Sequence, residues 1–82
     1  MSAIDSAIHS VLTGKFEVAQ DHIRPEATLE SLDLDSLALA ELALALQEEL
    51  GVEVHEHEAT KSTTVGELTA TLAAKRTAAG VL

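Results

Sequence analysis

The sequence predicts an all-α fold, a small four-helix bundle with three longer helices and one short third helix. Hydrophobic residues make up 46% of the chain but aromatic residues only 1%, so Leu, Ile, Val and Ala must build the core, which favours helices over sheets. Apolar residues also recur with helical spacing in separate stretches. The 82 residues have the size of one domain, which we assign to 1–82.

The first helix is expected at about residues 3–13, with Ser2 as its N-cap and Gly14 as its stop. Its apolar residues fall on one face. They are Ile4, Ile8, Val11 and Leu12.

A long connection follows, from residue 15 to residue 35, and it contains the only proline, Pro25. It has no sustained helical period, yet apolar residues are scattered through it. We therefore expect it to be held against the core rather than disordered. These apolar residues are Phe16, Val18, Ile23, Leu29, Leu32 and Leu34.

The second helix is predicted at residues 36–50, with Asp35 as N-cap and Gly51 as C′ residue. Its core-facing stripe consists of Leu39, Leu42, Ala43, Leu46 and Leu50.

Two leucines of this helix, Leu37 and Leu44, fall off that stripe and share a side with Glu41 and Glu48. Either the buried stripe is wider and both leucines belong to the core, or the four residues form an apolar and acidic docking strip. Periodicity alone leaves both readings open.

After the second helix, a short helix is expected at about 56–60 and the last helix at about 64–76. Thr64 and Glu67 fit a capping box, and Val65, Leu68 and Leu72 supply the apolar face. The tail 77–82 is expected to fray.

The formal net charge is −9, and residues 25–60 contain no Lys or Arg. A surface of one sign repels nucleic acid and anionic membranes, and it attracts proteins with basic patches. We therefore predict protein partners. The acids of this stretch are Glu26, Glu30, Asp33, Asp35, Glu41, Glu48, Glu49, Glu53, Glu56 and Glu58.

The chain has no cysteine, which excludes disulfides and thiolate metal sites. It shows no secretory signal pattern and no apolar stretch long enough to span a bilayer. We predict a cytoplasmic monomer that binds neither nucleic acid nor membrane.

A metal site could be imagined from His55, Glu56, His57 and Glu58. Histidines at i and i+2 do not face one another on a helix, and no further ligand is fixed by spacing. We expect solvated histidines and no metal.

A calcium loop starting at Asp33 is rejected on its ligand positions. Leu37 stands where an oxygen ligand belongs, Ala38 replaces the required glycine, and Leu44 replaces the closing glutamate.

A serine nucleophile is also rejected. His9 and His22 are far from Ser36 in sequence, and no strand–turn–helix elbow or oxyanion arrangement is evident. We predict that the chain is not an enzyme.

The most informative motif is Asp35-Ser36-Leu37, at the predicted start of the second helix. The turn exposes a hydroxyl there, and free N–H groups of a first helical turn suit a phosphate. In a short, acidic, helical chain, the run from Asp35 to Leu50 resembles the attachment signature of bacterial acyl carrier proteins.

The resemblance extends from about Ile4 to about Leu72 and includes Thr63-Thr64-Val65 before the last helix. It implies that a phosphopantetheinyl transferase moves 4′-phosphopantetheine from coenzyme A to Ser36. Asp35 would help to position the serine and the magnesium of the transferase.

The resemblance also implies partners and a docking surface. The terminal thiol would carry acyl groups as thioesters between a ketosynthase, an acyltransferase and other acyl-processing enzymes. The partner-recognition positions would be Leu37, Glu41, Leu44, Glu48 and Glu49.

The chain departs from the family pattern at several positions. Asp33 stands where glycine is usual, which is tolerated if the loop avoids positive φ. Ala38 and Gln47 replace acids of many fatty-acid carriers, and Ser62 replaces an apolar residue of the acyl pocket. These differences favour polyketide biosynthesis or another specialised pathway over housekeeping fatty-acid biosynthesis.

Two alternatives remain open. One is an aminoacyl or peptidyl-type carrier, although such carriers usually have Gly-Gly-His-Ser where this chain has Asp before Ser36. The other is an acidic helical adaptor in which Ser36 is only a helix residue.

Overall fold

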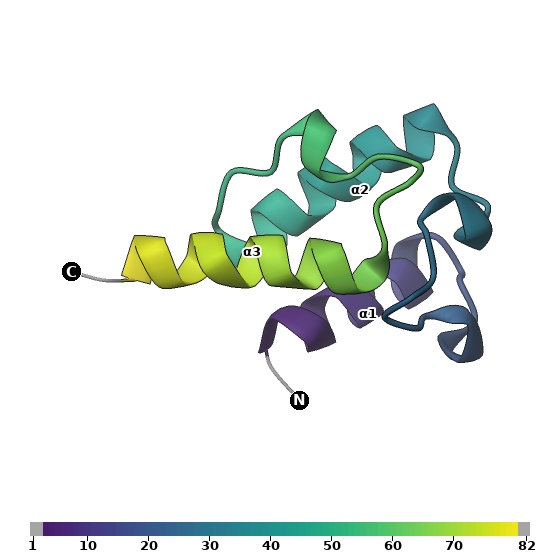
Figure 1. The fold of residues 1–82 in the computed structure, drawn as a ribbon, viewed down its shortest axis with the longest axis horizontal. Coiled ribbons are helices and arrows are strands. Elements are labelled where there is room, and N and C mark those ends of the chain that lie inside the picture. Colours follow the sequence, from purple (N-terminus) through teal and green to yellow (C-terminus); the bar gives the residue numbers. More distant parts are fainter. Residues whose placement is uncertain (1–2, 81–82) are drawn as a thin grey trace.

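Three α-helices form the framework of the protein (Figure 1): α1 (Ala3–Lys15), α2 (Ser36–Leu50) and α3 (Val65–Gly80). The computed structural model describes residues 3–80. Short 3-10 turns interrupt the connections: η1 (Gln20–His22), η2 (Glu30–Leu32) and η3 (Glu56–Glu58). No strand occurs within residues 3–80, so the all-α prediction is confirmed. The predicted short third helix is the single 3-10 turn η3.

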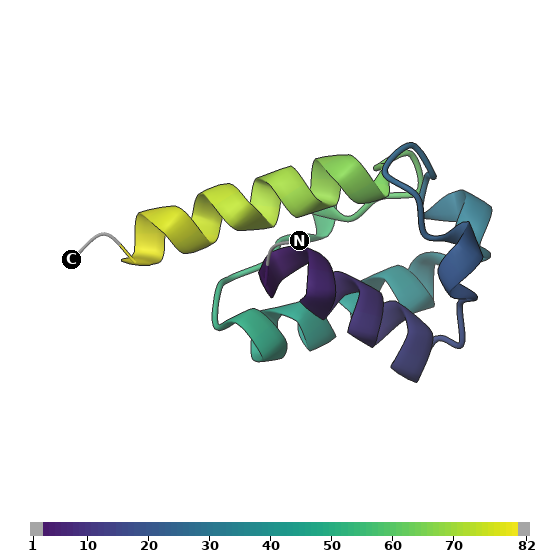
Figure 2. The ribbon, with the colours of Figure 1, turned by 90° about the horizontal axis from the view of Figure 1, so that it is seen from below.

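The helix α1 packs against both α2 and α3, and η3 packs against α2. The end of α3 projects beyond the other two helices in both views (Figures 1 and 2). This projection agrees with the elongated dimensions of the molecule, 38 × 25 × 20 Å. The core between the helices is purely aliphatic, and no polar or charged residue is buried among the described residues.

The buried face of α1 consists of the four predicted residues, Ile4, Ile8, Val11 and Leu12. The helix continues past Gly14, the predicted stop, and ends at Lys15. Gly14 is not in the left-handed conformation that ends many helices, so the turn that follows does not depend on it. The predicted N-cap, Ser2, lies outside the described residues.

The bounds of α2 and both of its caps agree with the prediction. A carboxylate oxygen of Asp35 accepts a hydrogen bond of 2.8 Å from the Ala38 N–H. Gly51 has a φ of 69° and donates to the Gln47 carbonyl at 2.9 Å. Ala45 is buried although it was not assigned to the core, whereas Leu50 is only half-buried. The other buried residues are Leu39, Leu42, Ala43 and Leu46.

The connection between α1 and α2 is held against the core, as its apolar content predicts. Phe16 is partly buried against the core, and the other five predicted residues are buried. The five buried residues are Val18, Ile23, Leu29, Leu32 and Leu34. Two other residues of this connection, Glu17 and Asp33, adopt positive φ angles of 55° and 64°.

Backbone hydrogen bonds join this connection to the segment that precedes α3. The Leu29 and Glu30 N–H groups donate to the carbonyls of Thr63 and Lys61 at 2.9 and 3.1 Å. The Gly66 N–H donates to the Pro25 carbonyl at 2.9 Å. A Cβ at Gly66 would lie 3.0 Å from that oxygen, so glycine permits the close approach.

The predicted capping box begins α3, because Thr64 and Glu67 exchange hydrogen bonds of 2.9 and 3.0 Å. Val65, Leu68 and Leu72 are buried, as expected. The backbone stays helical to Gly80, beyond the predicted end near residue 76. Of the tail expected to fray, residues 81 and 82 lie outside the described residues.

A polar contact ties η3 to α3. Lys75 Nζ lies 2.6 Å from a Glu58 carboxylate oxygen and donates to the Glu53 carbonyl at 2.7 Å. The same carboxylate accepts from the His55 N–H at 2.9 Å. Burial raises the pKa of Glu58, but hydrogen bonds from Lys75 and His55 and their positive charges lower it, and its pKa lies below 4.5.

Candidate functional site

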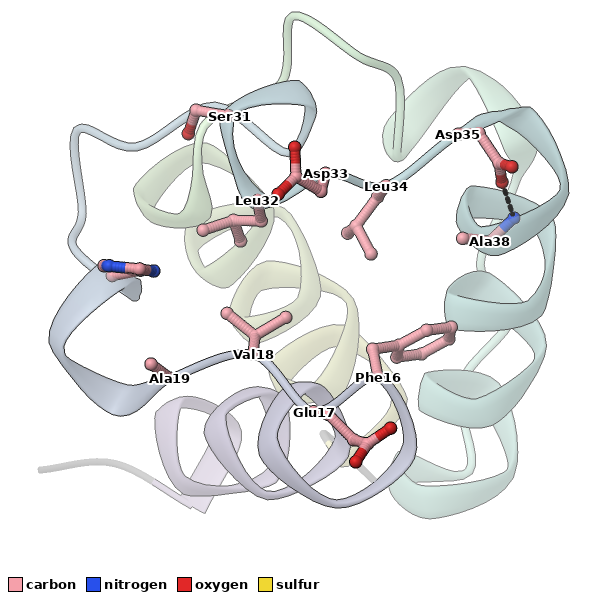
Figure 3. Close-up of a pocket in the computed structure, with 11 residues that line it drawn as sticks. Phe16, Glu17, Val18, Ala19, Ser31, Leu32, Asp33, Leu34, Asp35 and Ala38 are labelled. Carbon is pink, nitrogen blue, oxygen red and sulfur yellow. Dashed lines mark hydrogen bonds between the residues drawn. The ribbon is translucent and has the colours of Figure 1, made fainter.

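Ser36 is the first residue of α2, and its side chain is exposed. The preceding residue, Asp35, is extended, with φ of −86° and ψ of −176°. Its carboxylate caps the helix by accepting from Ala38, which fixes the turn that presents Ser36 (Figure 3). The predicted attachment residue is therefore accessible on a rigid helix start.

A pocket of about 320 Å³ opens beside Ser36, between the first turns of α2 and the η3 region. Leu39, Ala40 and Ala59 supply its apolar wall. Polar side chains from the far side complete the lining: Glu56, Thr60 and Lys61. A group attached to Ser36 therefore has space at the attachment point.

A second pocket, of about 440 Å³, lies on the other side of Asp35, between the two ends of the connection that joins α1 to α2. Figure 3 shows Val18, Leu32 and Leu34 directed toward its centre. Its exposed acids are Glu17, Asp33 and Asp35, and Ser36 does not line it.

The exposure of the off-stripe leucines of α2 decides against one of their two readings, burial in the core. Leu37 is 69% exposed and Leu44 is 60% exposed, the largest exposed hydrophobic residues among those described. Glu41, between these leucines, and Glu48, one turn after Leu44, are also exposed. The core reading was therefore wrong for both leucines. Glu49 is exposed as well.

A groove beside this strip was not predicted from the sequence. A groove of about 440 Å³ separates Leu44 from the end of α1, where Lys15 and Phe16 line it together with Glu41 and Glu48. Phe16, the only aromatic residue in the chain, was assigned to the core-facing connection. Its place in this groove depends on the packing of α1 on α2, which periodicity does not report.

None of the four histidines lines the pocket beside Ser36. His9 Nε2 is 3.9 Å from an Asp5 carboxylate oxygen on α1, and His22 lines the pocket on the far side of Asp35. His55 and His57 stack, with ring centroids 5.5 Å apart, although i and i+2 side chains were expected not to face each other. His55 precedes the 3-10 turn in an extended conformation, so the helical spacing rule does not apply.

No group of three or more metal-ligating side chains occurs among residues 3–80. None of the helices in this part of the chain has the length and apolarity needed to cross a bilayer.

Three of the residues that depart from the family pattern, Asp33, Gln47 and Ser62, lie in different parts of the structure. Asp33 does adopt positive φ, the conformation that the usual glycine favours. Gln47 Oε1 accepts from the Val54 N–H at 3.1 Å, so it holds the loop after α2. Ser62 is exposed and does not line the pocket beside Ser36, where Thr60 and Lys61 stand instead.

A small helical bundle with an accessible serine on a rigid helix start, and room beside it, fits a protein that carries a covalent group. The chain belongs to the phosphopantetheine attachment site family, whose pattern matches residues 6–72 and so includes Ser36. The prosthetic group of this family is covalently bound 4′-phosphopantetheine. Proteins of this family carry that group rather than act as catalysts, and they interact with a phosphopantetheinyl transferase and with acyl-processing enzymes.

Proposed function

We propose that this chain is an acyl carrier protein that bears its phosphopantetheine arm on Ser36. The exposure of this hydroxyl at the first residue of α2, next to the capping Asp35, is the observation that supports the assignment most directly. The adjacent pocket supports it further, because the residues around the hydroxyl leave room for the arm.

Loading requires one group transfer, catalysed by a separate transferase with its magnesium. A bond forms between Ser36 Oγ and the phosphorus of coenzyme A that bears the pantetheine. The pyrophosphate bond to the nucleotide half breaks, the nucleotide leaves with that oxygen, and the serine proton is released. In this scheme Asp35 helps to position the serine and the magnesium.

The loaded arm supplies the thiol that this cysteine-free chain lacks. Acyl groups are carried on that thiol as thioesters, so their chemistry belongs to the partner enzymes. Tethering keeps each intermediate at a high effective concentration near a docked enzyme.

We propose the exposed side of α2 as the docking surface for the transferase, a ketosynthase, an acyltransferase and other acyl-processing enzymes. Exposed leucines supply apolar anchors, and the exposed glutamates on the same helix attract basic partner surfaces and speed association. The surface consists of Leu37, Glu41, Leu44, Glu48 and Glu49, bordered by the groove at Lys15 and Phe16.

We assign the cargo to polyketide or fatty-acid-type intermediates, with preference for the former. The polar lining of the pocket, with Thr60, Lys61 and Glu56, suits a partly oxidised chain better than a long saturated one.

Incubation with coenzyme A, magnesium and a broad-specificity phosphopantetheinyl transferase tests the attachment site. Mass spectrometry should detect one added phosphopantetheinyl group on the wild type and none on Ser36→Ala. Ser62→Ala removes another exposed hydroxyl and should be modified normally. A folded wild type that gains no mass would instead favour the adaptor.

A further inference from the structure

The surroundings of Ser36 are acidic, with one exception. Residues 25–60 contain no Lys or Arg, whereas Asp35 and Glu56 flank the hydroxyl and its pocket. Lys61 is the single cation that lines this pocket together with Ser36. We propose that Lys61 binds the phosphodiester on loaded Ser36 and thereby directs the arm into the pocket between α2 and η3.

The backbone at Lys61 is fixed. Its carbonyl accepts from the Glu30 N–H at 3.1 Å, and the neighbouring Thr63 carbonyl accepts from the Leu29 N–H at 2.9 Å. The Thr63 hydroxyl also receives the Thr60 N–H at 3.0 Å. Lys61 therefore extends from a rigid loop, and only its side chain must be ordered on binding.

The side chain of Lys61 is exposed, and no carboxylate among residues 3–80 lies within ion-pair distance of it. Other cations are placed differently. Lys75 is paired with Glu58, Lys15 lines the groove at Leu44, and Arg24 donates to the Asp21 carbonyl at 3.3 Å. Arg76, on α3, does not line the pocket beside Ser36. Lys61 is thus the cation whose position suits an anion attached to Ser36.

A phosphodiester carries one negative charge and is joined directly to the Ser36 oxygen. Without a cation the phosphodiester would be repelled by Asp35 and Glu56. The arm would then extend into solvent, where this repulsion is weakest. Pairing with Lys61 places the first part of the arm at the pocket mouth, from which the apolar wall of Leu39, Ala40 and Ala59 is accessible.

This inference rests on the attachment to Ser36, and the experiment separates the two. Wild type, Lys61→Gln, Lys61→Arg and Lys15→Gln are each loaded to completion, as verified by mass. Methyl NMR then compares the unloaded and loaded forms at Ala59 and Thr60, which line the pocket but lie far from Ser36 in sequence.

Loading should shift the Ala59 and Thr60 methyl signals in the wild type. Lys61→Gln should reduce the ratio of pocket-bound to free arm by about threefold, as expected for loss of an exposed ion pair. Lys61→Arg should retain the shifts, and so should Lys15→Gln, which removes an equal charge outside this pocket. Glu56→Gln should enlarge them, and salt of about 0.5 M should reduce them in the wild type.

Failure of the wild type to load would overturn the attachment site itself. Complete loading with the same methyl shifts in the wild type and Lys61→Gln would overturn the role of Lys61 and leave the carrier function intact. Equal losses in Lys61→Gln and Lys15→Gln would also overturn it, because the effect would then reflect net charge alone.

Discussion

The two sides of α2 use the same residue type for different purposes. Leu46 is fully buried, whereas Leu44, two positions earlier, is 60% exposed. On the buried side the leucines belong to one aliphatic core together with residues of the other helices. On the exposed side the leucines alternate with glutamates and do not belong to the core. Burial removes apolar area from water and stabilises the fold, so the exposed leucines are available for another surface.

This contrast is sharpest in a matched pair of truncations. Leu46→Ala should lower the free energy of unfolding by about 3 kcal/mol, because it removes a fully buried side chain and leaves a cavity. Leu44→Ala should change it by less than about 0.5 kcal/mol. Urea unfolding followed by circular dichroism measures both values.

One of these two variants, Leu44→Ala, also tests the proposed docking surface. Leu44→Ala should be loaded several times more slowly than the wild type at equal helicity, because an apolar anchor of the proposed surface is lost. A Leu44→Ala variant that loads at the wild-type rate would remove Leu44 from that surface.

Charge reversal addresses the acidic component of the exposed side. Glu48→Lys, or Glu41→Lys, should lower the transferase kcat/KM by about tenfold at low salt while helicity is unchanged. Glu26→Lys, an exposed acid outside α2, provides the matched control. Convergence of these rates at high salt would identify the effect as electrostatic, and equal rates at low salt would exclude this side as the docking surface.

Sequence periodicity predicted the buried side of α2 but left its exposed side open. Asp35 and Gly51 fix the ends of the helix through local hydrogen bonds, and local patterns suffice to find them. Whether Leu37 and Leu44 are covered depends on where α1 lies, and that is a tertiary property. The groove at Phe16 escaped prediction for the same reason.

Long-range polar contacts were equally inaccessible from the sequence. Lys75 and Glu58 pair across the space between α3 and η3, and Lys61 reaches the Ser36 pocket because backbone bonds hold its loop. The candidate attachment site was predictable because its residues are contiguous. Its surroundings were not, since they come from a segment that follows α2.

Glu58 is an acid with a structural role, unlike Glu48. Its pKa is lower in the folded protein than its ordinary value of 4.5, so it stabilises the fold above that value, and the contribution is lost as pH falls through the folded pKa. Glu58→Gln should therefore lower the free energy of unfolding by about 0.5–1 kcal/mol near neutral pH.

The deficit of Glu58→Gln should be smaller in acid, at a pH below 4.5, than near neutral pH, because the wild-type carboxyl takes up its proton as pH falls through the folded pKa. Urea unfolding at the two pH values measures it. Glu53→Gln, in which the replaced side chain is 77% exposed, should show little effect at either pH. A deficit that persists in acid would mean that Glu58 contributes through packing rather than charge.

The smallest expected effect lies in the loop that presents Ser36. Asp33 has φ of 64°, where an L side chain is strained, although Asp tolerates this region better than most residues. Asp33→Gly should therefore stabilise the fold by no more than about 0.5 kcal/mol, because relief of strain is partly offset by the greater freedom of glycine in the unfolded chain.

Asp33→Ala provides the control, because it removes the same carboxylate but keeps a Cβ. It should destabilise the fold by about 0.5–1 kcal/mol. If both variants were stabilised equally, the carboxylate and its repulsion by the neighbouring acids would be the cause rather than the backbone. The left-handed turn would then carry no strain, and the absence of glycine at this position would have no bearing on how the loop presents Ser36.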